Sequence, residues 1–308
     1  MPSRLPTRRL PLTRRRFVAR LFAWHATRDR HLLVRDAATA WEVLVAEVMS
    51  HQTGIERVGP YWRRFVDTWP TPTALADAPT RDLLGAWSGL GYNRRALALR
   101  ETARLIASEH GGSVPRRVSE LERLPGIGPY TARAVAATAF GTPVAPLDVN
   151  VSRVVGRVAG IERGSRDLQP AADALVARGH ARRWLNAVMD LAERVCTLRK
   201  PACDVCPVFS MCATRGTNGT GELAGGVTAD ATGDVPAAGR LAQAPFRHTT
   251  RWLRGRLVAV LTDVPAGTWL PLPDAVGTHD RHAVAEAAAA LEREGFVELD
   301  GGRLRLRP

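Results

Sequence analysis

Apolar residues recur at helical spacing along most of the first two hundred positions of this chain. A stripe within residues 17–24 predicts a first helix, and the stretch 41–67 repeats the same period. Glycine and proline interrupt the period at 89–91 and 125–128, which is typical of turns between helices. No run of eighteen apolar residues occurs, so we expect no membrane span. The pattern favours an all-α core.

The pattern changes after the last cysteine of the chain. Residues 215–245 are rich in Gly, Ala and Thr and almost free of large apolar side chains, which predicts a flexible linker. Helical periodicity returns in 251–263 and 283–295, followed by two strand-like pieces, FVELD and RLRLRP, joined by Gly-Gly. Two helices and a small hairpin predict a winged-helix-like domain over 246–308.

The sharpest break in the helical pattern is LPGIGPY. It predicts a tight hairpin between two helices, the second beginning near Tyr130. Gly126 and Gly128 can adopt positive φ and allow a ligand to approach the backbone, while unpaired N–H groups open the next helix. This is an anion site, and a nucleic-acid phosphate is the expected anion. The alternative is an ordinary helix–helix turn.

The charge of the chain supports a polyanionic partner. Its 43 Lys and Arg against 30 Asp and Glu give a formal charge of +13. Most of the basic residues are Arg, whose fork matches phosphate oxygens. A coding bias toward Arg explains the residue type better than it explains the excess of positive charge. The 308 residues suffice for two domains with their own cores.

The N-terminus superficially matches an export signal. Thr13–Phe17 reads TRRRF, but Arg20, His25 and Arg28 interrupt the apolar region that such a signal needs. We therefore expect a cytoplasmic protein associated with the nucleoid.

Two carboxylates are candidates for chemistry. Glu47 falls within an apolar helical stretch, where burial would raise its pKa toward working pH, as an acid catalyst requires. The alternative is a paired or protonated structural glutamate. Asp148 precedes a helical run that carries Arg153 and Arg157. It can be a helix N-cap, but an acid beside a phosphate site should repel the ligand, which suggests chemistry.

All four cysteines lie within seventeen residues and have the spacing C-x6-C-x2-C-x5-C: Cys196, Cys203, Cys206 and Cys212. Disulfides are unexpected in such a chain, so thiolate ligation of a metal is favoured. Zinc sites usually use two CxxC pairs, and only one is present here.

The motifs LPGxGxxTA and LDxNVxRV, with the cysteine spacing, resemble the helix–hairpin–helix DNA glycosylases, in particular the endonuclease III and MutY group and most closely the MutY branch. The likeness runs from about Leu21 to Cys212. It implies a two-lobed all-α core: a basic arm and helix in 1–35 packs with a cluster lobe in 148–214, and 36–147 forms the lobe with the hairpin. It also implies a [4Fe–4S] cluster on the four cysteines, whose first role is to fold the loop.

The resemblance implies roles for four residues once a nucleotide is flipped from the duplex. AEVMSHQT is similar to the family's EVMLQQT, so Glu47 would protonate the departing base. Asp148 would stay ionised and stabilise the positive sugar, and Asn150 would orient Asp148 or a phosphate. Tyr130 stands where endonuclease III has its nucleophilic lysine. Without an amine no Schiff base forms, so no or weak lyase activity is expected.

The resemblance also implies a set of DNA contacts. WSGLGYNRRA is similar to the family's LGYYxRA, which makes Tyr92 a wedge or stacking residue; the alternative is a cap on a core edge. The implied contacts come from the turns and the cluster loop: Gln52, Thr53, Tyr92, Gly126, Gly128, Arg153, Arg199 and Lys200.

The implied base pocket departs from the family pattern. The family's LPWR is Leu32–Arg35 here, so Val34 replaces tryptophan beside Arg35. The family's QQT is His-Gln-Thr here, so His51 replaces the first glutamine. Ala187 stands where the family has an acidic or amide residue. Lost polar groups can relax or change the choice of base.

We therefore expect a monomeric, monofunctional glycosylase of base excision repair that acts on duplex DNA with a mispaired or damaged base. The expected base is adenine opposite guanine or 8-oxoguanine, in a short form without the large C-terminal domain that reads 8-oxoguanine. One alternative is a uracil or thymine mismatch glycosylase of the same superfamily. Another is a non-catalytic iron–sulfur DNA-binding protein, although the presence of both acids argues against it.

Overall fold

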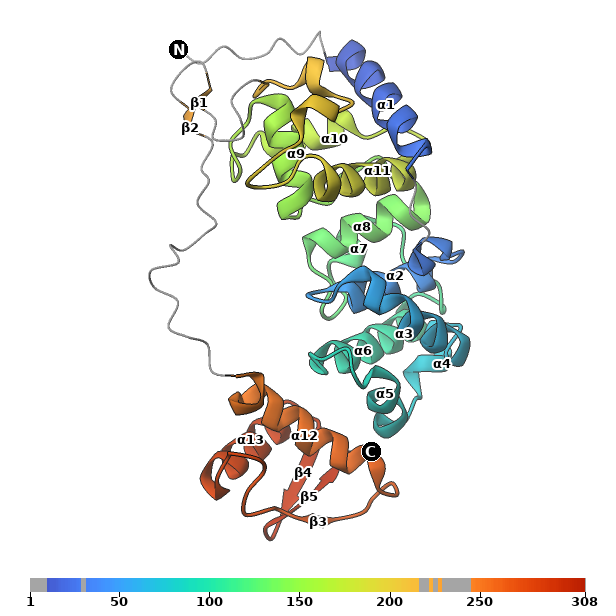
Figure 1. The fold of residues 1–308 in the computed structure, drawn as a ribbon. Helices are drawn as coiled ribbons and strands as arrows, with labels where there is room; N and C mark the ends of the chain where they lie inside the picture. Colours follow the sequence, from blue (N-terminus) through green and yellow to red (C-terminus); the bar gives the residue numbers. More distant parts are fainter. Residues whose placement is uncertain (1–9, 29–31, 216–221, 224–226, 229–244, 308) are drawn as a thin grey trace.

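In the computed structural model, the residues described are 10–28, 32–215, 222–223, 227–228 and 245–307. They form two stacked helical lobes with a small sheet-containing domain at one end (Figure 1). Between residues 32 and 215 every regular element is helical, which confirms the predicted all-α core. None of the described helices combines the length and apolar character needed to cross a membrane.

The first lobe, here called the hairpin lobe, is built from consecutive helices: η2 (Leu33–Asp36), α2 (Ala40–Ser50), α3 (Ile55–Thr68), α4 (Pro72–Ala76), α5 (Thr80–Trp87), α6 (Arg94–Glu109), α7 (Val118–Leu121) and α8 (Pro129–Phe140). Its core contains the fully buried Trp62 and Trp87. Thr39 begins α2 with a capping box closed by Glu42, which satisfies donors that the first turn leaves unpaired. This cap fixes the start of the helix that carries Glu47.

The second lobe, here called the cysteine lobe, combines both ends of the core sequence: α1 (Leu10–Ala26), α9 (Val149–Ala159), α10 (Leu168–Leu175), α11 (Ala181–Arg194), η3 (Cys203–Val205) and η4 (Phe209–Met211). Helix α1 packs on α10 and α11 and places Phe17 and Leu21 in the core. Helix α8 serves both lobes, because Ala136 lies in one core and Ala137 in the other.

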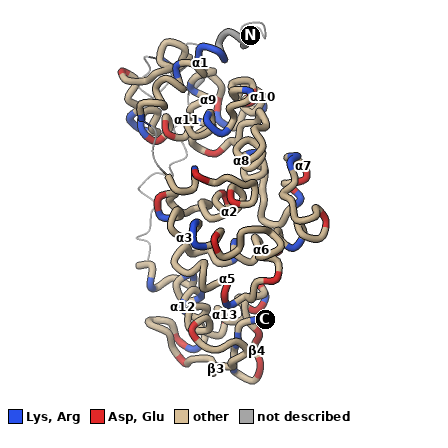
Figure 2. The backbone as a smooth tube through the Cα atoms, turned by 90° about the vertical axis from the view of Figure 1, so that its right-hand side faces the viewer, with Lys and Arg blue, Asp and Glu red and all other residues tan. Residues whose placement is uncertain are grey.

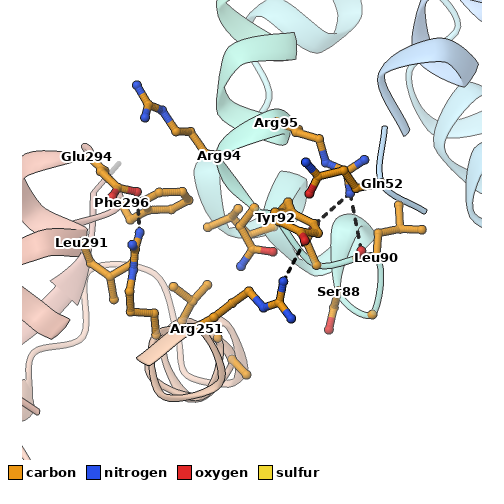
Figure 3. Close-up of a pocket in the computed structure, with 18 of the residues that line it drawn as sticks. Gln52, Ser88, Leu90, Tyr92, Arg94, Arg95, Arg251, Leu291, Glu294 and Phe296 are labelled. Carbon is orange, nitrogen blue, oxygen red and sulfur yellow. Dashed lines mark hydrogen bonds and ion pairs between the residues drawn. The ribbon is translucent and has the colours of Figure 1, made fainter. Parts of the chain in front are cut away.

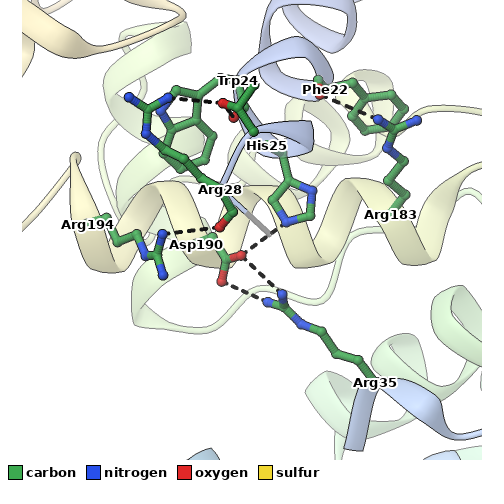
Figure 4. Close-up of polar contacts among 9 residues, drawn as sticks. Phe22, Trp24, His25, Arg28, Arg35, Arg183, Asp190 and Arg194 are labelled. Carbon is green, nitrogen blue, oxygen red and sulfur yellow. Dashed lines mark hydrogen bonds and ion pairs between the residues drawn. The ribbon is translucent and has the colours of Figure 1, made fainter. Parts of the chain in front are cut away.

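A buried ion pair joins the two lobes (Figure 4). Asp190 of α11, only 2% exposed, accepts two hydrogen bonds from Arg35, at 2.7 and 3.1 Å. His25 Nε2, at the end of α1, lies 3.0 Å from the same carboxylate. Removing either Arg35 or Asp190 would leave the other charge buried without its partner, which costs about 3–5 kcal/mol in comparable sites.

The C-terminal domain contains two helices and a three-stranded antiparallel sheet: η6 (Phe246–His248), α12 (Thr250–Asp263), β3 (Leu270–Pro271), α13 (Arg281–Arg293), β4 (Val297–Asp300) and β5 (Arg303–Leu306). The strand order is β3–β5–β4. Gly301 and Gly302 have φ of +52° and +79°, as a two-residue hairpin turn requires. The two helices and the small hairpin expected from the sequence are observed, while the two-residue strand β3 was too short to predict.

The predicted linker, 215–245, falls largely outside the described residues. Within it the structure describes a short antiparallel pair, β1 (Glu222–Leu223) and β2 (Val227–Thr228).

Candidate active site and nucleic-acid interface

Glu47 lies on α2, flanked by the buried residues Ala46 and Val48, with its own side chain only partly exposed. Burial, and after it the negative charge of Asp148, raise the pKa of its carboxyl from the usual 4.5 to about 7. Such a group is partly protonated near neutral pH and can deliver a proton.

Asp148 is the N-cap of α9, so the structural role considered from the sequence is observed. Its carboxylate accepts hydrogen bonds from the backbone N–H groups of Asn150 (2.9 Å) and Val151 (2.7 Å). Asn150 Nδ2 also donates to it, at 3.1 Å. These three donors fix the orientation of the carboxylate, and the capping role does not prevent a chemical one.

Tyr130, in the first turn of α8, lies near Glu47 and Asp148 and completes a group of three candidate catalytic residues. Burial raises the pKa of its phenol above the ordinary value, and the charges of Glu47 and Asp148 raise it further. The phenol therefore stays neutral. The three side chains come from α2, α8 and α9 and are within electrostatic range of one another, where the two lobes meet.

The hairpin between α7 and α8 matches the predicted motif, with one correction. Gly126 has φ of +75°, but Gly128 has φ of −84° and is the N-cap of α8, so only the first requires the left-handed region. A Cβ on Gly126 would also lie 3.1 Å from that of Ala98. Among the described residues no side chain caps α8, and its first residue is Pro129. The N-terminal N–H groups of α8 are therefore available to an anion.

Two turns, one after α2 and one before α6, are held in strained conformations. Gln52 and Tyr92 have φ of +55° and +52°, a region that costs a non-glycine residue about 1–3 kcal/mol. Both side chains are exposed, Tyr92 by 41%. Strain of this kind persists where surrounding contacts impose it, and such sites are often functional.

Arg95 supplies those contacts, and the sequence reasoning missed it. It donates to oxygen atoms of both turns: the carbonyls of Val48 (3.0 Å), Met49 (2.9 Å), His51 (2.5 Å), Leu90 (3.4 Å) and Gly91 (3.0 Å), and Thr53 Oγ1 (3.2 Å). Its guanidinium also lies 5.5 Å from the Tyr92 ring centre (Figure 3). The signal in the sequence was the second of the two arginines after GYN, which matches the arginine of LGYYxRA.

His51 joins the first turn to α8. Its Nε2 lies 2.9 Å from Thr131 Oγ1. Burial, and then the positive charge of Arg95, lower the pKa of the imidazole, so the ring is neutral at neutral pH. A neutral imidazole can accept or donate a hydrogen bond beside a base.

The remaining residues of the predicted base pocket lie elsewhere. Arg35 is committed to the buried pair with Asp190. Ala187 is fully buried in the core of the cysteine lobe, so it cannot line an open pocket. Val34 is half-buried against the core of the hairpin lobe. The resemblance to the family motif predicted these positions, but whether each side chain faces the core or an open pocket depends on how its helix packs.

Of the three basic residues among the predicted DNA contacts, two are exposed and one is hydrogen-bonded within the cysteine lobe. Arg199 and Lys200 lie on the surface of the cysteine loop. Arg153 instead donates to Cys196 O (2.7 Å) and to Asn150 Oδ1 (3.0 Å), so it links the cysteine loop to the residue that holds Asp148. Basic residues are spread over both lobes and the C-terminal domain, interspersed with acids (Figure 2).

The four cysteines converge on one cavity of the cysteine lobe, bounded by Val154, Leu191 and Phe209. Burial raises the pKa of the Cys206 thiol to about 11, and the neighbouring thiols contribute. In the described part of the chain no three His, Cys, Asp or Glu side chains have the geometry of a metal site. Four convergent thiols are nevertheless the donor set that iron–sulfur clusters use.

Comparisons with known proteins agree with the fold and the motifs. Residues 45–177 match the HhH-GPD superfamily of base excision DNA repair proteins. The adenine DNA glycosylase of Mycolicibacterium smegmatis is 40% identical over 286 residues, which cover 90% of this chain and 91% of that protein. The human adenine DNA glycosylase is 36% identical over 214 residues, which cover 65% of this chain and 39% of that protein.

Solved structures give the same fold. A thermostable thymine-DNA glycosylase has a TM-score of 0.62 and 27% identity, covering 67% of this chain and 97% of that one. A trapped endonuclease III–DNA covalent intermediate has a TM-score of 0.55 and 22% identity, covering 65% and 95%. The chain therefore belongs to the HhH-GPD superfamily of base excision DNA repair proteins, in the branch of the adenine DNA glycosylases.

Proposed function

We propose that this protein is a monofunctional DNA glycosylase that removes adenine from mispaired duplex DNA. One observation carries the proposal: Glu47, whose pKa is about 7, lies near the carboxylate of Asp148 at the junction of the lobes. That carboxylate is the N-cap of α9. The name shared by the relatives, adenine DNA glycosylase, supports the choice of base.

Glu47 and Asp148 have different roles in the reaction. Glu47 in its protonated form donates its proton to the departing base as the N-glycosidic bond breaks. Asp148 remains charged and stabilises the positive charge that develops on the sugar. Water then adds to the sugar carbon, so the products are the free base and an abasic site. Asn150 keeps the Asp148 carboxylate in place through its amide, at 3.1 Å.

Tyr130 limits the reaction to hydrolysis. A phenol with a raised pKa is not a nucleophile at neutral pH, and residues 121–157 contain no lysine. No Schiff base with the sugar can form from this segment, so the DNA strand is left intact.

The α7–α8 hairpin and the two turns held by Arg95 form the DNA-binding face. The uncapped N-terminus of α8 suits a backbone phosphate. Gln52 and Tyr92 are exposed at the tips of their turns, where they can enter the duplex as a base leaves it.

We further propose that Cys196, Cys203, Cys206 and Cys212 hold a [4Fe–4S] cluster. With all four thiolates as ligands such a group has no open iron site, so it would cross-link the loop and present Arg199 and Lys200 to DNA. Purified protein should contain about four irons per chain and absorb broadly near 400 nm. Stoichiometric zinc without iron in anaerobic preparations would contradict this assignment.

The decisive experiment incubates the protein with duplexes that carry A opposite G, A opposite 8-oxoguanine, T opposite G or U opposite G, and measures abasic sites after alkali. Release of adenine alone is the expected result. Release of thymine or uracil would support the mismatch glycosylase alternative, which the thymine-DNA glycosylase fold match makes worth testing. No release from any duplex, with DNA binding retained, would refute catalysis.

A further inference from the structure

A large cavity lies between the C-terminal domain and the turn that carries Tyr92, and both line it (Figure 3). Its volume is about 1410 Å³, whereas pockets for small molecules measure roughly 300–1,000 Å³. Its walls come from α6 and the Tyr92 turn on one side and from α12 and α13 on the other. The size favours an extended ligand.

The charged side chains that line this cavity are mostly arginines: Arg57, Arg94, Arg95, Arg251, Arg254 and Arg256. The one acid in the lining, Glu294, is paired with Arg254. Arg95 is turned toward backbone carbonyls, but Arg94, Arg251 and Arg256 are exposed. The cavity therefore presents an uncompensated positive surface, which suits a polyanion.

Arg251 of α12 joins this surface to the Tyr92 turn. Its Nη1 donates to the Tyr92 hydroxyl at 2.7 Å, and its guanidinium lies 5.1 Å from the centre of the Tyr92 ring. It lies equally close, at 5.1 Å, to the ring of Phe246, which is 57% exposed. Cations interleaved with exposed aromatic rings are typical of nucleic-acid surfaces.

The position of Arg251 is fixed by the packing of the C-terminal domain on the hairpin lobe. Helix α12 packs on α5, and Arg81 Nε donates to Thr262 O at 2.9 Å. The buried side chains of α12, including Leu253 and Leu257, belong to the same continuous core as the hairpin lobe. Arg251 therefore meets Tyr92 as part of one packed surface.

We infer that the C-terminal domain is a second DNA-contacting unit: the exposed arginines on its side of the cavity, Arg251 and Arg256, bind the phosphate backbone beside the Tyr92 turn, and Arg251 positions Tyr92. This inference rests on the proposed function, because it requires duplex DNA on the same face. It assigns a role to a domain whose fold alone indicates none.

The test measures equilibrium binding of the full chain to an A·G duplex at several salt concentrations. Arg251→Ala and Arg256→Ala should each weaken binding several-fold and reduce the slope of log K against log salt by about 0.9, the value for one phosphate contact. Arg281→Ala is the matched control, because Arg281 is equally basic, exposed and on α13 but outside the cavity lining. An unchanged slope in Arg251→Ala and Arg256→Ala would overturn the inference.

A double-mutant cycle tests the positioning role. Arg251→Ala and Tyr92→Phe remove the two partners of one hydrogen bond, so their effects on affinity should be non-additive by several-fold. Arg251→Lys should restore the salt slope, because it keeps the charge. Additive effects would overturn the positioning of Tyr92. Since binding does not depend on which base is released, failure of the excision assay together with the expected reductions in salt slope would refute only the proposed function.

Discussion

The pKa of Glu47 allows a direct test of the proposed chemistry. With a pKa of about 7 the carboxyl is half protonated at pH 7, whereas at its usual 4.5 roughly one molecule in 300 would be. The single-turnover rate of base release should therefore be level below about pH 7 and fall about tenfold for each unit above it. Glu47→Gln should abolish release at every pH, because an amide cannot deliver the proton.

The same shift predicts how stability depends on pH. The raised pKa means that the folded state binds a proton more tightly than the unfolded state, so stability falls as pH rises from about 4.5 to 7. Above that window the ionised carboxylate costs about 3.5 kcal/mol, because the pKa rises from 4.5 to about 7 and each pKa unit corresponds to about 1.4 kcal/mol. Glu47→Gln removes this cost, so the variant should be more stable than the natural protein at high pH.

The assay is denaturant unfolding of both proteins across this pH range. The stability gained by Glu47→Gln should grow by about 2 kcal/mol between about pH 5.5 and 8.5. Glu109→Gln, an exposed change of the same charge, is the control and should show no such growth. A gain that does not vary with pH would refute the raised pKa. A release rate that stays level above about pH 8 would refute proton delivery by Glu47.

Three further predictions concern neighbouring residues. Asp148→Asn should retain DNA binding and the cap of α9, since asparagine is also a good N-cap, but should lose at least about 100-fold in base release; near-normal release would remove Asp148 from the mechanism. Borohydride should trap no complex with the natural protein, and Tyr130→Lys should permit trapping; efficient trapping without that change would contradict the monofunctional assignment. Arg95→Ala should lower the free energy of unfolding by at least about 3 kcal/mol, because several charge-assisted hydrogen bonds to the two strained turns are lost. A loss below about 1 kcal/mol would show that the two turns keep their conformation without Arg95.

The sequence by itself determined the local features of this protein. The hairpin before α8 follows from glycine and proline at fixed offsets, and the start of α9 follows from the capping chemistry of Asp148. The four-cysteine spacing and the Gly301–Gly302 turn are also local. Such features can be predicted because backbone geometry and capping involve residues only a few positions apart. The motifs that place the chain in its family have the same local character.

Only the tertiary structure decided which distant residues meet. Arg35 pairs with Asp190 across 155 positions, which withdrew it from the predicted base pocket. Tyr92 and Arg251 are separated by 159 positions, so nothing in either motif indicated their contact. The raised pKa of Glu47 likewise comes first from burial between packed helices and then from Asp148, which α9 brings close to α2. Burial, long-range hydrogen bonds and electrostatic coupling depend on how helices pack, and side-chain spacing along the chain does not specify that packing.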